Sequence, residues 1–268
     1  MIHRKYKHAF PHVYRFQNLT IKMIHPLTPA EIEEFKIAAY ASAAEDTRKS
    51  CYVSRDRSHF IKLNKIKRLS KQLRVSLGIA KPFDYFLKEL ENNVALNALS
   101  IQAPRLTGYL LYSKMGLTQR GGLVFDNLEG KEGAGAYINA YPSSIAPTIA
   151  LALRLLADLQ AKNIFHMDPR LENMMIDPVT PERLSAIDFE HCYIGEPADK
   201  AAMTGMVYGM FYKSGVTAHI SEREYDQLVM AVADQYMPHL NFQEIYSRAK
   251  SRFMEREECR NMFMLGHI

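Results

Sequence analysis

The chain has 268 residues, of which 47% are hydrophobic and 24% charged, and it carries a formal net charge of +5. This composition is ordinary for a soluble globular protein that forms one large domain or two lobes. The charge favours polyanions such as nucleotides, phosphorylated sugars or an anionic membrane face, but it is too small to indicate nucleic acid binding. Three widely spaced cysteines, and an N-terminus without an apolar signal core, predict a cytoplasmic protein.

The longest apolar run, residues 145–161, does not predict a membrane span, because Arg154 and Asp158 interrupt it.

Nearer the N-terminus, a helix is predicted after Thr28, which is a good N-cap and is followed by a proline and acidic residues. Residues 37–41 either continue this helix or form a strand, and periodicity does not decide between the two.

A β-hairpin is predicted over residues 49–63, because two β-prone runs flank a polar connection. Lys62 lies in its second run and opens a basic stretch that extends to Arg74. A lysine on an edge strand is commonly a solvated residue, and a charge run is commonly a solvated helix face. The alternative is a patch for an anionic acceptor or a membrane, where each basic residue contributes about 1 kcal/mol.

A helix is expected over about residues 81–99. Counted from Glu91, apolar residues fall at helical spacing and place a stripe on the side of that carboxylate. An inward carboxylate needs a partner, and Lys62 is the natural one. Glu89 ranks second, since asparagines occupy its equivalent positions, and the plain alternative for Glu91 is a surface residue. The stripe consists of Val94, Ala95, Ala98 and Leu99.

An apolar run at 123–125 breaks into the acidic connection 126–130, which ends in glycine. This pattern is typical of a hinge between a lobe at 1–125 and a lobe at 131–268, although a surface turn would use the same residues. Beyond it, a serine-capped apolar helix is predicted to follow residue 144, and the last third of the chain has further helical patterns.

The most distinctive chemistry lies in residues 164–190. Asp168 opens a tight loop, Asn173 follows five residues later, and a short apolar run then turns back toward Asp188. The turn predicts a hairpin that brings Asn173 and Asp188 onto adjacent strands. A carboxylate in such a loop can accept the proton of an attacking hydroxyl, and two hard oxygen ligands suit Mg²⁺. Taken singly, these residues read as turn residues and a core histidine.

With Lys62, Glu91, Asp168, Asn173 and Asp188 in this order, the chain resembles the protein-kinase-like superfamily. Within it, the chain is most similar to the bacterial lipopolysaccharide core sugar kinases, particularly the heptose kinases. This narrower similarity covers about residues 35–195. It rests on Glu45-Asp46-Thr47, the lysine-rich insertion after Lys62, Asp168-Pro169, and the compact segment after Asp188.

The resemblance implies an α+β, bilobal protein-kinase-like fold, with an antiparallel sheet and one main helix in a small N-lobe and a mostly helical C-lobe. It implies an enzyme that uses ATP and Mg²⁺ to phosphorylate a sugar hydroxyl, with a heptose of the lipopolysaccharide core as the sugar. The acceptor is then a glycolipid or sugar at the inner face of the inner membrane. Peripheral contact with anionic lipid is expected only if the basic stretch after Lys62 is a membrane patch.

The resemblance also assigns roles to residues of the N-lobe, of the hinge and of the stretch 164–190. Asp168 would be the catalytic base, and Asn173 and Asp188 would hold the metal. Lys62, with Lys65 as the fallback, would hold the ATP phosphates. Glu91 would orient the side chain of that lysine. The backbone of the hinge would bind adenine, and His166 would position the catalytic loop.

Two departures from the family pattern leave other functions open. The loop expected to cover the phosphates, residues 42–46, contains no glycine, and Glu190 stands where glycine is usual. One alternative is therefore a pseudokinase that binds a partner without catalysis. The absence of an A-P-E sequence weighs against protein substrates, so the other alternative is a kinase of a soluble small molecule.

Overall fold

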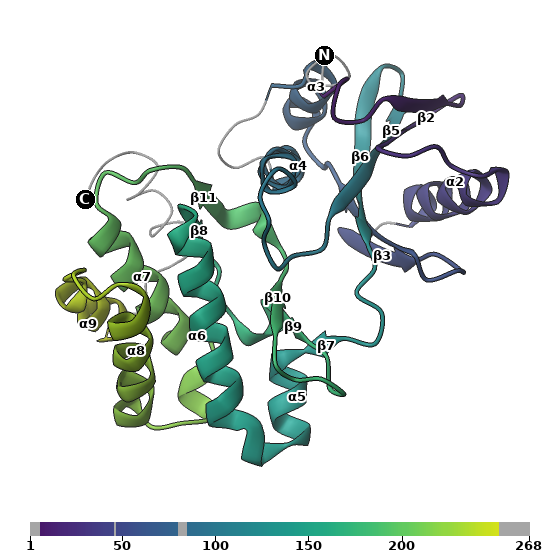
Figure 1. The fold of residues 1–268 in the computed structure, drawn as a ribbon. Coiled ribbons are helices and arrows are strands. Elements are labelled where there is room, and N and C mark those ends of the chain that lie inside the picture. The colour runs from purple at the N-terminus through teal and green to yellow at the C-terminus, as the bar shows by residue number, and fades with distance from the viewer. Residues whose placement is uncertain (1–5, 46, 80–84, 252–268) are drawn as a thin grey trace. The chain divides into compact units, whose positions relative to one another are not determined.

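The computed structural model describes residues 6–45, 47–79 and 85–251. The chain divides into two compact units, the first made of residues 1–100 and 104–129 and the second of residues 101–103 and 130–268. The first unit holds an antiparallel sheet, whereas the second is mostly helical (Figure 1). The predicted α+β class, with the sheet first and helices after it, is confirmed.

The first unit is built on a six-stranded antiparallel sheet with the order β1-β2-β5-β6-β4-β3. The predicted hairpin is confirmed as β3 and β4, which pair from Lys49 opposite Asn64 to Val53 opposite Phe60. Strands β1 and β2 are not predicted from the sequence, because each is a short run without strong flanking turn signals. The strands are β1 (His12–Arg15), β2 (Leu19–Met23), β3 (Lys49–Val53), β4 (His59–Lys65), β5 (Leu106–Lys114) and β6 (Leu117–Asp126).

Helix α2 (Pro29–Ala44) begins where the sequence predicts it. The Thr28 hydroxyl accepts a hydrogen bond from the backbone N–H of Glu31, and the Glu31 carboxylate accepts one from the Thr28 N–H at 2.7 Å. This capping box satisfies two of the N–H groups that a helix start leaves open. The helix continues through residues 37–41, because its second half is rich in alanine, the strongest helix former.

The end of α2 corrects the expectation of a phosphate-covering loop at residues 42–46. Residues 42–44 form the last helical turn, and Asp46 lies outside the described residues. Arg120 of β6 fastens this end of the helix, donating a 2.9 Å hydrogen bond to the Ser42 hydroxyl and further bonds to the carbonyls of Glu45 and Thr47. These bonds occupy carbonyls at a helix C-terminus, where no intrahelical donor exists.

The two faces of the sheet bury separate cores. On one face, Phe35 of α2 packs against Ile61 and neighbouring aliphatic residues. On the other, Phe86 and Leu90 of α4 (Tyr85–Leu96) pack against Tyr109 and neighbouring residues. Helix α3 (Leu69–Leu77) lies against β6. The sheet is therefore held from both sides, which fixes the positions of residues on β4.

The second unit contains α5 (Ala134–Ala140), α6 (Ile145–Ala161), α7 (Lys200–Lys213), α8 (Glu222–Tyr236) and α9 (Gln243–Ser251) among its described residues. Helix α6 confirms the apolar helix predicted after residue 144, but the Ser144 side chain does not cap it and donates instead to the carbonyl of Tyr141. Together with the preceding turn, it is long and apolar enough to cross a membrane by length and composition alone. Within this unit it packs against α8 and buries Ile149, Leu153 and Leu156, as a core helix does.

The described part of the second unit also has five short strands: β7 (Glu132–Gly133), β8 (Ile164–His166), β9 (Met174–Ile176), β10 (Leu184–Ala186) and β11 (Cys192–Ile194). Strand β11 pairs with β8, whereas β9 lies between β10 and β7. These pairings bring both ends of residues 164–194 together and set the frame of the candidate site.

Candidate active site

His166 ties the start of the candidate loop to its end. It is buried at the last position of β8, where its Nδ1 lies 3.3 Å from the backbone N–H of Asp168 and its Nε2 lies 2.9 Å from the carbonyl of Ile187. Because an N–H only donates and a carbonyl only accepts, the ring carries its proton on Nε2. Burial lowers the pKa of His166, which keeps the ring neutral. These contacts fit the positioning role predicted for it.

The carboxylate of Asp168 is buried and holds two neighbours. Its Oδ1 accepts a 3.0 Å hydrogen bond from Nε of Arg170, and its Oδ2 accepts one of 3.3 Å from Nδ2 of Asn173. The same Asn173 nitrogen donates to the Asp168 carbonyl at 2.9 Å. Since the amide nitrogen is used on Asp168, the amide oxygen of Asn173 is the atom left to act as a metal ligand. Arg170, to which the sequence assigns no role, places a cation beside the carboxylate of Asp168.

The predicted hairpin between Asn173 and Asp188 is confirmed. Strands β9 and β10 pair with Met174 opposite Ala186, and the N–H of Ile187 donates to the carbonyl of Asn173 at 2.9 Å. Asn173 and Asp188 thus flank the same end of the hairpin. Asp188 has the left-handed backbone conformation, with φ 63°, which aspartate tolerates better than most residues.

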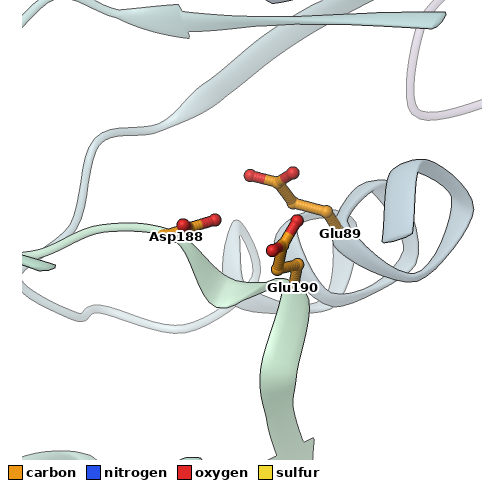
Figure 2. A group of neighbouring side chains, drawn as sticks. All are labelled: Glu89, Asp188 and Glu190. Carbon is orange, nitrogen blue, oxygen red and sulfur yellow. The ribbon is translucent and has the colours of Figure 1, made fainter. Parts of the chain in front are cut away.

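A second carboxylate, Glu190, follows Asp188 in the turn that leads to β11. Figure 2 shows the side chains of both residues on this turn. Glu190 is buried, and its Oε1 lies 3.3 Å from Nε2 of His191. Carboxylate and amide oxygens are the hard ligands that Mg²⁺ prefers, so the donors of this turn and of Asn173 fit that ion.

In the first unit, Lys62 of β4 forms an ion pair with Glu89 of α4. Of this pair, Figure 2 draws the Glu89 side chain. Nζ of Lys62 lies 2.8 Å from Oε1 of Glu89, and the two side chains are only 11% and 2% exposed. The prediction of Glu91 as the partner is wrong. Glu91 instead lies 3.8 Å from Lys88 on the outer part of the same helix.

The error lies in the choice of the inward face of α4. Side chains two positions apart on a helix point about 200° apart, so Glu89 and Glu91 cannot share one face. The inward face carries Phe86, Leu90 and the buried Asn93, whose Nδ2 donates to the carbonyl of Glu89 at 2.8 Å. The stripe chosen from the sequence is largely exposed, and its last residues lie beyond the end of the helix at Leu96. The predicted helix start near residue 81 lies outside the described residues.

Lys65, the fallback for Lys62, lies on the other face of the sheet, since side chains alternate along a strand. It lines a pocket of about 330 Å³ together with Arg120 and Gln72. Lys62 is therefore the lysine that faces α4. The roles of Lys62, Asp168, Asn173 and Asp188 stay predictions, and Glu89 takes the place of Glu91 beside Lys62.

Comparison with known proteins finds similar solved structures but no matching sequence. No protein-family model and no curated protein sequence matches the chain. Similar solved structures include WaaP in complex with acyl carrier protein (13% identity, TM-score 0.45), which matches 77% of this chain and 86% of that chain. They also include monomeric WbdD (16% identity, TM-score 0.47) and the ROP18 kinase domain in complex with AMP-PNP and sucrose (14% identity, TM-score 0.42).

WbdD is described as a bifunctional kinase-methyltransferase. Its match spans 90% of this chain but only 52% of WbdD, and the ROP18 match covers 87% of this chain and 90% of that domain. The chain is thus similar to kinase structures, in agreement with the resemblance seen in the sequence. Because identities and TM-scores are low, its function is inferred from its own residues.

Proposed function

We propose that the protein transfers the γ-phosphoryl group of ATP to a sugar hydroxyl. The observation that supports this most is the arrangement of three residues in the second unit. Asn173 donates hydrogen bonds to Asp168, and the β9–β10 hairpin brings Asp188 to the same end as Asn173. In the reaction, the acceptor oxygen forms a bond to the γ-phosphorus, and the bond from that phosphorus to the bridging oxygen breaks and releases ADP. The hydroxyl proton passes to the carboxylate of Asp168.

The other residues bind and orient. Asn173, through its amide oxygen, and Asp188 would hold Mg²⁺, which neutralises phosphate charge when bound. Lys62 would contact the ATP phosphates, and Glu89 would keep its ammonium group in place, because their 2.8 Å ion pair restricts a long flexible side chain. In this proposal, residues 1–125 form the phosphate-binding lobe, residues 126–130 the adenine-binding hinge, and residues 131–268 the catalytic lobe.

The acceptor we propose is a heptose of the lipopolysaccharide core, and the site of action is the cytoplasmic side of the inner membrane. The support is the family resemblance of residues 35–195, in particular Asp168-Pro169 and the lysine-rich segment after Lys62. A soluble small-molecule acceptor is the nearest alternative, since the same hydroxyl chemistry would serve it.

The helical end of α2 favours one further candidate, a pseudokinase. Residues 42–44 are helical and without glycine, so their backbone N–H groups are turned into the helix instead of toward a phosphate. A pseudokinase would gain thermal stability from ATP and Mg²⁺ but would release no phosphorylated product from any acceptor.

Mass spectrometry of core oligosaccharide from cells with and without the protein tests the proposal. We expect the core from cells without it to lack one phosphate group. The group should return when the wild-type chain is supplied and not when Asp168→Asn is supplied. An unchanged phosphate content would exclude the lipopolysaccharide assignment.

A further inference from the structure

Helix α3 carries a stripe of leucines on its solvent side. Leu69, Leu73 and Leu77 follow each other at intervals of four, which aligns them along one side of the helix, and they are between 46% and 66% exposed. Ile79, just beyond the helix, is 52% exposed. An apolar stripe of this kind on a protein surface marks an interaction site more often than a scattered single leucine does.

A neighbouring side of α3 is fastened to the first unit. Nε2 of Gln72 donates to the carbonyl of Ile66 at 2.7 Å, and the Ser76 hydroxyl accepts a 2.9 Å hydrogen bond from the N–H of Thr118. Val75 is buried on the same side. Gln72, Val75 and Ser76 therefore hold the helix to the first unit, and the leucines stay exposed.

The neighbouring turn between β5 and β6 adds a fifth exposed apolar residue. Met115 at its tip is 93% exposed and has φ 52°, followed by Gly116 with φ 76°. Two-residue turns of this type favour asparagine before glycine, so methionine contributes neither turn chemistry nor packing here. Thr118, three residues further on, is the residue bonded to Ser76 of α3, and Figure 1 shows α3 and this end of β5 and β6 at the same end of the sheet.

Basic residues lie on α3 and on the segments next to it. Lys67 and Arg68 are exposed directly before α3, Lys71 and Arg74 lie on it, and Lys114 is exposed beside Met115. The sequence from residue 62 to residue 80 contains no aspartate or glutamate. The surface thus combines outward leucines with cations of one sign, which is the pattern of helices that lie in the interface of an anionic membrane.

We infer that α3 and the Met115 turn dock the first unit on an anionic lipid bilayer. The leucines and Met115 enter the boundary between headgroups and acyl chains, and the cations contact lipid phosphates. An acidic protein is the other class of partner. The cations next to exposed leucines favour a bilayer, because it offers anionic headgroups and an apolar interior on the same surface. The inference extends the proposed function, since a lipid-linked acceptor lies on such a surface, yet it is drawn from α3 and Met115 alone.

Vesicle binding tests the inference with the whole chain. Sedimentation with vesicles of phosphatidylglycerol and phosphatidylcholine is compared with sedimentation with phosphatidylcholine alone. We expect binding to the anionic vesicles only, and at least a tenfold loss in the triple variant L69S/L73S/L77S. The double variant K67S/R68S should lose about fivefold for each cation removed.

Matched controls come from exposed residues elsewhere. Ile37→Ser removes an equally exposed apolar residue from α2, and R154S/R183S removes two exposed cations from the second unit. Both variants should bind like the wild type. Equal losses in these controls, or binding that persists in the triple variant, would overturn the inference.

A second measurement avoids the risk that the triple variant misfolds. The chain contains no tryptophan, so L73W introduces a single fluorescent probe on α3, with I37W as its control. Anionic vesicles should shift the emission of L73W to shorter wavelength, and brominated lipid should quench it, with neither effect in I37W. An L73W emission that ignores vesicles but shifts with an acidic protein would place a protein partner there and refute membrane docking.

The two proposals fail separately. Phosphate transfer to deacylated, soluble core oligosaccharide without vesicles reports the phosphotransferase alone, and L69S/L73S/L77S should keep that activity. Vesicle binding without any phosphate transfer would refute the proposed function and leave the docking surface in place. Phosphate transfer by a wild-type chain that binds no vesicles would refute the docking surface only.

Discussion

The loop around Asp168 and the ion pair of Lys62 reach their geometry in different ways. In the loop, hydrogen bonds join His166, Asp168, Asn173 and Ile187, which lie within about twenty residues of one another and involve the backbone at almost every step. The Lys62 pair instead joins a strand to a helix across 27 positions of the sequence. It therefore depends on which face α4 turns to the sheet, a choice that packing of the whole unit makes.

The largest effect is expected in the loop. Asp168→Ala removes the group that accepts the hydroxyl proton, and we expect kcat for phosphate transfer to fall about 10²- to 10⁴-fold. The surrounding contacts of His166 are to backbone atoms, so the fold should persist. Steady-state kinetics with circular dichroism as a control would check this, and a variant with wild-type kcat would remove Asp168 from the mechanism.

Glu89 and Glu91 offer a matched pair for the other region. Glu89→Ala removes a carboxylate that contacts the buried Lys62 and should lower the free energy of unfolding by about 3 kcal/mol. Glu91→Ala removes a half-exposed residue and should change it by less than about 0.5 kcal/mol. Urea unfolding of both variants measures the difference. Equal effects would mean that the face of α4 assigned here is wrong.

His166 gives the loop a pH dependence. Its pKa is lowered by burial below the ordinary value of 6.5, so as pH falls the unfolded chain takes up the proton first. The stability that the neutral ring contributes is therefore complete above pH 6.5 and is lost as the pH drops below it. The difference in unfolding free energy between wild type and His166→Gln should shrink by up to about 1.4 kcal/mol per pH unit there. A difference that stays constant from pH 7.5 to 5.5 would contradict a neutral, buried ring.

The smallest effect concerns a local signal in the first unit. Thr28→Ala removes the hydroxyl half of the capping box of α2 and should lower the free energy of unfolding by about 1 kcal/mol. Glu33→Ala, which removes only a surface pair with Lys36, should change it by less than about 0.5 kcal/mol. Urea unfolding distinguishes the two, and a silent Thr28→Ala would show that tertiary packing alone starts this helix.

Features that depend on neighbouring residues could be predicted from the sequence, and features that depend on distant contacts could not. The cap at Thr28, the hairpin at 49–63 and the hairpin before Asp188 rest on neighbouring residues, and each is present in the structure. The partner of Lys62 depends on contacts between elements distant in the sequence, and there the sequence is misleading. Buried asparagines made the true inward face of α4 look polar.

Arg170 shows a third kind of omission. It lies two residues after Asp168, and its guanidinium contacts both carboxylate oxygens of that residue. Nothing in hydrophobic periodicity marks such a residue, and only its nearness to Asp168 in the sequence could have drawn attention to it. Strands β1 and β2 are likewise not predicted, because runs of four and five residues carry little periodic pattern.

The most direct test of the central claim is phosphate transfer by the purified protein. Dephosphorylated core oligosaccharide is incubated with ATP, Mg²⁺ and either the wild-type chain or Asp168→Asn. The mass of the oligosaccharide product is then measured by mass spectrometry. We predict that the wild type adds the mass of one phosphate group and that Asp168→Asn adds none in the same time. Equal product from both proteins, or ATP binding without product from the wild type, would contradict the account.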